Sequence, residues 1–170
     1  MKRPVLHLLI LMALLPLLHG CEKYPENPIR PYLPHPITIL PSETHYFDPS
    51  TNLYHDLNFV SEWVYLTADI ESTSRGIIVY RQSETEFLAY DRLPPNYPDA
   101  CTDSHGNTTR LVVDFPFVVD RCNNAYYNIL DGQIIIGPDR IPVFETDEGV
   151  IYPLIQYHTQ FDGHKLTVYN

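Results

Sequence analysis

Short β-forming runs separated by turn residues recur about every ten residues through most of this chain. After residue 20, no stretch keeps the apolar period of about 3.6 residues that marks an amphipathic helix. Clear runs of this kind are 37–40, 63–67, 76–81, 86–90, 111–114, 117–119, 127–136 and 166–169. Because side chains alternate across a strand, each run can place one face against a core. The pattern therefore predicts an all-β protein.

Turn residues divide several of these runs into hairpins. Asp131-Gly132 lies within an alternating stretch, and Asp162-Gly163 precedes the last run of the chain. Asp-Gly pairs favour tight hairpin turns, because glycine accepts the positive φ that such turns require. Residues 82–85 join two further runs. We therefore expect three hairpins at these positions.

The first twenty residues have the organisation of a secretory signal. Lys2-Arg3 is followed by an apolar run from Val5 to Leu18, which is short for a membrane span. Leu18-His19-Gly20-Cys21 then fits a lipobox, in which a signal peptidase cuts before the cysteine and the cysteine is acylated. His19 departs from the small residue usual at its position. We expect Cys21 to be a lipid anchor; the alternative is a plain signal peptide beside an incidental cysteine.

Cleavage before Cys21 leaves 150 residues, which is enough for one domain with its own core. Lys2 and Arg3 are lost with the signal, so the formal net charge changes from −10 to −12. Such a charge argues against a nucleic-acid partner and against attraction to anionic lipid. We expect a cell-envelope protein that its lipid holds at the outer membrane. The prediction does not choose between the periplasmic face and the cell-surface face.

Prolines crowd the segment that follows the anchor, at residues 25, 28, 31, 34 and 36. This density excludes helix and favours extended, polyproline-like chain. The predicted organisation is a signal over residues 1–20, a lipidated and proline-rich tether over 21–36, and a β domain over 37–170. Within the tether, we expect free chain to about Ile29 and chain docked on the domain beyond it.

Two loops carry the remaining cysteines. The first loop begins at 91–96, directly after a β-forming run, and Cys101 follows closely; the second spans 120–125 and contains Cys122. With Cys21 acylated, these two cysteines form an even pair in an oxidising compartment. The two loops are therefore the first place to look for a functional site.

The chain around these loops resembles a known family. The segments 76–92 and 128–143, the two-loop section between them and the closing residues are similar to the Rieske-like lipoproteins of Bacteroidetes, over roughly residues 31–170. The resemblance implies a Rieske-like iron–sulfur-protein fold, with small antiparallel sheets and two apposed loops. In Rieske domains those loops bind a [2Fe–2S] cluster through Cys-x-His and Cys-x-x-His.

The cluster ligands are mostly replaced in this chain. The four ligand positions fall on Pro94, Asn96, Cys122 and Ala125. Proline and alanine have no lone pair to offer iron, and one thiolate cannot hold a cluster. The resemblance therefore implies a domain without its [2Fe–2S] cluster, and we expect no cofactor.

The resemblance also implies a disulfide between Cys101 and Cys122, since the two loops face each other in the Rieske framework. Closing a loop of this length contributes about 3 kcal/mol by the chain-entropy model. The alternative is metal binding by Cys101 and His105, completed by Asp103. That spacing matches no common ligand motif, and the second loop supplies no histidine.

No motif of a known catalytic class is present, neither a nucleophile elbow nor a zinc-protease helix nor a phosphate-binding glycine loop. Aspartates surround the loops, at positions 91, 99, 103, 114 and 120. At turns, such carboxylates usually cap backbone N–H groups rather than transfer protons. Tyr97, between an asparagine and a proline, is a candidate exposed contact for a partner protein or a glycan.

Three functions from different classes remain open at this point. The first is a lipid-anchored, cluster-free Rieske-like module that binds a partner or supports the envelope, and it is not an enzyme. The second is a Rieske-type electron-transfer protein, which the family fold alone suggests. The third is an envelope hydrolase that uses the loop carboxylates.

Overall fold

The structure is a computed structural model that describes residues 27, 29–41, 54–67, 71–96, 101–102, 104, 106, 108–137, 139 and 150–170. The predictions for the signal, Cys21, Tyr97, Asp103 and His105 lie outside these residues. Within the described ranges, no helix is long and apolar enough to cross a membrane.

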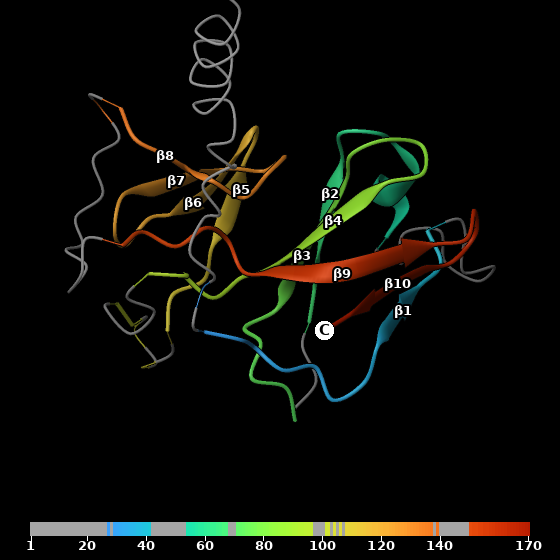
Figure 1. The fold of residues 1–170 in the computed structure, drawn as a ribbon, viewed down its shortest axis with the longest axis horizontal. Coiled ribbons are helices and arrows are strands. Elements are labelled where there is room, and N and C mark those ends of the chain that lie inside the picture. The colour runs from blue at the N-terminus through green and yellow to red at the C-terminus, as the bar shows by residue number, and fades with distance from the viewer. Residues whose placement is uncertain are drawn as a thin grey trace, which may run out of the picture.

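Ten strands form two antiparallel sheets in the described part of the chain, which confirms the all-β prediction (Figure 1). The larger sheet bends into a half-barrel with the order β1 (Ile37–Ile39), β10 (Leu166–Tyr169), β9 (Gln156–Phe161), β4 (Phe87–Asp91), β3 (Ile77–Arg81) and β2 (Trp63–Leu66). The smaller sheet has the order β5 (Val112–Asp114), β6 (Phe117–Asp120), β7 (Ala125–Asn128) and β8 (Ile134–Ile135). It is inserted between β4 and β9. One 3₁₀ turn, η3 (His55–Asn58), precedes β2.

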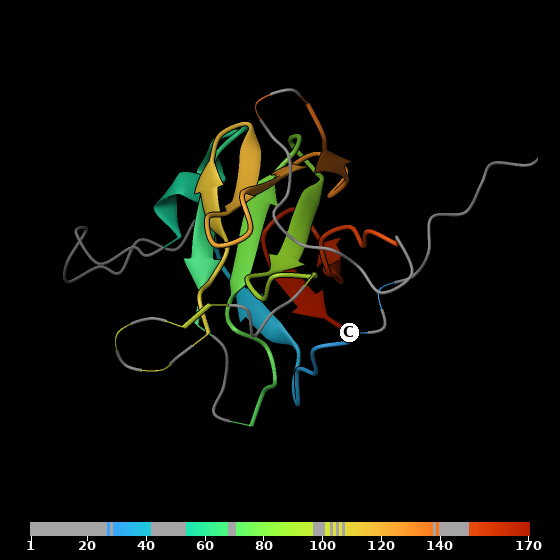
Figure 2. The same ribbon diagram turned by 90° about the vertical axis from the view of Figure 1, so that its left-hand side faces the viewer.

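Strand β3 lies between two hydrophobic cores. All five of its residues are buried. Its odd-numbered Ile77 and Val79 face the core inside the half-barrel, together with Leu57 and Leu166. Its even-numbered residues face a second core, which lies between the two sheets and includes Tyr127 of β7. Figure 2 shows the smaller sheet lying across the green strands β3 and β4. The smaller sheet is thus packed against the larger one rather than separate from it.

The three predicted hairpins are confirmed. Strands β3 and β4, β7 and β8, and β9 and β10 pair as antiparallel neighbours. Gly132, in the β7–β8 turn, has a φ of 71°. A Cβ added there would lie 3.2 Å from the Tyr90 ring and 3.3 Å from the Leu154 side chain. Both the turn and the packing around it therefore require glycine.

The N-terminal segment is docked on the domain before β1 begins, within the residues 21–36 that the predicted organisation assigns to the tether. Leu33 is 4 % exposed and belongs to the half-barrel core. Its backbone N–H and carbonyl both bond to the side chain of Asn170, the last residue (3.2 and 3.0 Å). The expectation of docked chain beyond Ile29 agrees with this packing.

Candidate functional site

Two loops meet at one end of the domain, which we call the two-loop end. It comprises 92–96 and the described residues of 101–110, between β4 and β5, and 121–124, between β6 and β7. Each loop begins with an Asp-Arg pair, and each aspartate is the last residue of its strand. Both aspartates are buried and bond to the backbone N–H two residues later. The two loops thus start with the same local geometry.

Asp91 is the centre of a buried hydrogen-bond network, although it is 0 % exposed. Its Oδ1 accepts the N–H groups of Leu93 (2.6 Å) and Arg75 (3.3 Å). Its Oδ2 accepts the hydroxyl of Tyr157 (2.6 Å), from β9. Burial and the Asp91 charge raise the pKa of the Tyr157 hydroxyl, so the tyrosine remains a donor. Asp91 therefore caps the first loop and ties it to β9.

Asp120 organises the second loop in the same way. Its Oδ1 accepts the N–H groups of Cys122 (3.0 Å) and Asn123 (3.3 Å), and its Oδ2 accepts the Asn123 side-chain amide (2.7 Å). Since Asp91 and Asp120 each accept hydrogen bonds from backbone N–H groups of the turn that follows, the prediction that they cap turns is confirmed. Asp114 is exposed at the end of β5.

Asn96 cross-links three segments of the chain from a buried position (3 % exposed). Its amide nitrogen donates to the Tyr127 hydroxyl of β7 (3.1 Å) and to the Tyr152 carbonyl (2.9 Å). Its Oδ1 accepts the Tyr152 N–H (2.9 Å). Burial raises the pKa of Tyr127, against the lowering effect of the bond from Asn96. Both polar atoms of Asn96 therefore already have partners within the fold.

Two other residues at the positions where the resemblance implies cluster ligands are packed inside the domain. Pro94 is buried beside Leu93, and Ala125 is 0 % exposed within the core between the sheets. Cys122 alone among the four keeps a ligand type, and it lies next to Cys101. No three His, Cys, Asp or Glu side chains of the described residues form a group that could hold a metal. The residues present do not fit a [2Fe–2S] cluster.

Cys101 and Cys122 lie at disulfide-bonding distance, with their Cα atoms 6.0 Å apart. Cys101 stands at the base of a small antiparallel bridge between Thr102 and Thr108, and its carbonyl accepts the Thr109 N–H (3.0 Å). Cys122 is held by Asp120. The pair therefore connects two loops that are each braced by their own hydrogen bonds.

Arg92 connects the first loop to the edge strand β2. Its guanidinium lies 3.8 Å from the Tyr65 ring centroid, and its Nε donates to the Leu111 carbonyl (3.0 Å). The Tyr65 hydroxyl accepts the Val113 N–H (2.9 Å), which joins β2 to β5. This cation–π contact braces the side of the two-loop end, and sequence reasoning did not identify it.

Tyr90 is a buried polar side chain without a hydrogen-bond partner in the part of the chain that the structure describes. It is 1 % exposed, and its hydroxyl has no hydrogen bond among the described residues. Tyr157 is buried to a similar degree but bonds to Asp91. Because an unsatisfied buried hydroxyl costs about 1–3 kcal/mol, the two tyrosines are a matched pair for measuring that cost.

We expect Tyr90→Phe to leave the free energy of unfolding unchanged or to raise it by up to about 1 kcal/mol, and Tyr157→Phe to lower it by about 2 kcal/mol. Urea unfolding at neutral pH measures both.

Burial also raises the Tyr90 pKa above its usual 10.0. Above pH 10 the unfolded chain loses this proton while the folded one keeps it, so stability falls as pH rises. The fall should be shallower in Tyr90→Phe. A loss in Tyr90→Phe equal to that in Tyr157→Phe would show that the Tyr90 hydroxyl has a partner.

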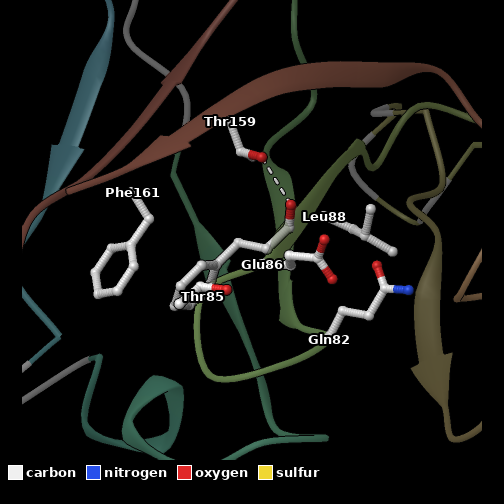
Figure 3. A pocket seen from close by; sticks show the side chains of 7 residues that line it. Gln82, Thr85, Glu86, Leu88, Thr159 and Phe161 are labelled. Carbon is white, nitrogen blue, oxygen red and sulfur yellow. Dashed lines mark hydrogen bonds between the residues drawn. The ribbon is translucent and has the colours of Figure 1, made fainter. Parts of the chain in front are cut away.

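A separate open pocket lies where β4 and β9 diverge. The two strands pair only at 89–157 and 90–156, and beyond this point the Thr159 hydroxyl donates to the Phe87 carbonyl (2.7 Å). The pocket encloses about 280 Å³, and Figure 3 shows Phe161 on one side and the polar ends of Glu86 and Gln82 on the other. Its lining offers no nucleophile–base pair.

The comparisons with known proteins give no further identification. No protein-family model, no curated protein and no solved structure matches this chain.

Several residues that build the two-loop end carried no sequence signal. Tyr127 stands in an ordinary β-forming run, Tyr152 and Tyr157 precede the Asp162-Gly163 turn, and nothing in the spacing of the three tyrosines links them to Asn96 or Asp91. The hydroxyl of a buried tyrosine usually bonds to a partner. The thirteen tyrosines of the chain were therefore the available signal, but their number could not identify the partners.

Proposed function

We propose that this protein is a lipid-anchored component of the cell envelope, whose Rieske-like domain carries no cluster and acts as a binding or structural module. The proposal rests on the lipobox at Cys21, on the resemblance over residues 31–170 and on an arrangement in which a four-stranded sheet is inserted between β4 and β9. Two loops at one end of that insertion agree with the framework that the resemblance implies.

The observation that carries the proposal is the environment of Asn96. At a position where the family pattern has a cluster ligand, its side chain is used fully to hold Tyr127 and Tyr152. Ala125, at another such position, fills core space. Residues at two positions where the resemblance implies cluster ligands thus take part in hydrogen bonding and packing of the fold. This supports a domain in which internal contacts have replaced metal binding.

The two alternatives are less well supported. Electron transfer needs ligands at Pro94, Asn96 and Ala125 that these side chains cannot supply. Hydrolysis by loop carboxylates needs a carboxylate free to exchange protons, whereas Asp91 and Asp120 are buried and each accept three hydrogen bonds within the fold.

The test uses the full chain, expressed in a bacterium that acylates lipoproteins and extracted from its membrane fraction. We expect no iron by elemental analysis, no visible absorption and no EPR signal after reduction. We expect Cys21→Ser to leave the protein outside the membrane fraction, because about 0.8 kcal/mol per buried lipid CH₂ is lost with the acyl chains. About two irons per chain with a Rieske-type EPR signal would overturn the cluster-free assignment. Equal membrane association of both proteins would overturn the lipid anchor.

A further inference from the structure

The docked N-terminal segment runs from the two-loop end toward β1, and we call its described residues, 27 and 29–36, the strap (Figure 1). Three contacts fix it. Leu33 bonds to Asn170, as described above, and the Tyr32 backbone bonds to the side chains of Thr73 (2.7 Å) and Ser72 (2.7 Å). These two contacts hold the middle of the strap along the body of the domain.

The third contact lies at the beginning of the strap. The Asn27 side chain donates to the carbonyl of Pro95 in the first loop (3.2 Å), and its Oδ1 accepts the Ile29 N–H (2.8 Å). Asn27, the first described residue, therefore lies beside the two-loop end, away from the first strand β1. The position of this contact decides which end of the domain can approach the anchor.

Docking shortens the reach between anchor and domain. A fully extended chain spans at most about 3.5 Å per residue. If the tether were free as far as Ile37, the sixteen residues from Cys21 would span roughly 56 Å. With Asn27 fixed on Pro95, only six residues remain, and they span roughly 21 Å. The first length would allow any orientation of the domain above the membrane, whereas the second does not.

The 82–86 hairpin lies at the other end of the domain, because β4 runs from this hairpin to Asp91 at the base of the first loop. A domain of this length is roughly 36 Å across. If the hairpin faced the bilayer, the Asn27–Pro95 contact would lie on the side of the domain away from the surface, at a height approaching that width. Six residues could not cover this distance.

We propose that the two-loop end is the membrane-proximal surface of the domain, and that the 82–86 hairpin and the pocket beside it point away from the membrane. The inference rests on the lipid anchor of the proposed function. It identifies the kind of partner for each end. A partner of the disulfide-bridged loops must lie at or in the membrane surface, whereas the pocket faces the aqueous compartment.

The experiment compares two positions on the lipidated full-length protein in vesicles of phosphatidylethanolamine and phosphatidylglycerol that carry an acceptor dye on the headgroups. A genetically encoded fluorescent amino acid replaces either Arg121, exposed in the second loop, or Glu84, exposed in the hairpin. Neither substitution involves a cysteine. We expect clearly higher energy transfer to the membrane from residue 121 than from residue 84. Equal or reversed transfer in protein that floats with the vesicles overturns the orientation.

A control variant carries about twenty Gly and Ser residues inserted between Lys23 and Tyr24, which adds a flexible reach of roughly 25 Å. We expect the difference between the two positions to shrink in this variant. A difference that persists undiminished would mean that the short tether does not set the orientation, and would overturn the argument. Failure of the unmodified protein to float with vesicles would instead contradict the lipid anchor itself, so the two failures can be told apart.

Discussion

Removal of the Cys101–Cys122 bond is expected to lower the free energy of unfolding by about 3 kcal/mol. The bond would close a loop of 21 residues, and the chain-entropy model gives about 3 kcal/mol for loops of this size. The loss should be close to this value, because Asp120 and the Thr102–Thr108 bridge hold the two loops in place without the bond. The native loop geometry should therefore survive its removal.

The measurement is urea unfolding of the domain purified without reductant, compared with the Cys101→Ala/Cys122→Ala double variant. Mass spectrometry of the wild-type protein should show a deficit of about two daltons that reduction abolishes, since each disulfide lacks two hydrogens. Reductant should lower the unfolding midpoint of the wild-type domain and leave the variant unchanged. Free thiols in the oxidised preparation, or the same midpoint in both proteins, would contradict the bond.

The strand positions could be predicted from sequence because their causes are local. Alternation in 127–136 and the Asp131-Gly132 turn define β7 and β8, and Gly132 proved necessary for both φ and packing. The segment 76–81 gave no alternation, since β3 is buried on both faces. Its apolar run was nevertheless sufficient to predict a strand.

What could not be predicted depends on contacts between distant residues. Strand β9 pairs with β4 across more than sixty residues, and Leu33 meets Asn170 across 137. Neither contact leaves a local pattern in the sequence. The two-residue alternation of a strand shows which of its faces is buried, but not which strand lies next to it. From the sequence, Asn96 was likewise interpreted as a replaced cluster ligand. Only its hydrogen bonds to Tyr127 and Tyr152 identify it as a cross-link.

The second large effect is expected at Asp91. Asp91→Ala should lower the free energy of unfolding by about 4 kcal/mol, because it leaves three donors without an acceptor inside the domain, and each unsatisfied group costs about 1–3 kcal/mol. These donors are the N–H groups of Leu93 and Arg75 and the hydroxyl of Tyr157. The loss exceeds that of a single hydrogen bond, since the aspartate connects β4, the first loop and β9.

Two variants separate this network from the simple loss of a negative charge. Asp114→Ala removes a carboxylate from the exposed end of β5 and should change stability by no more than about 0.5 kcal/mol. Asp91→Asn keeps the shape and one acceptor oxygen, so its cost should fall between those of the two alanine variants. Chemical unfolding of all three domains measures these values. If Asp91→Ala cost no more than Asp114→Ala, the carboxylate would not be the link between the first loop and β9. In that case the Asp91 network would not be what holds the first loop, and with it the Pro95 carbonyl that binds the strap, in position.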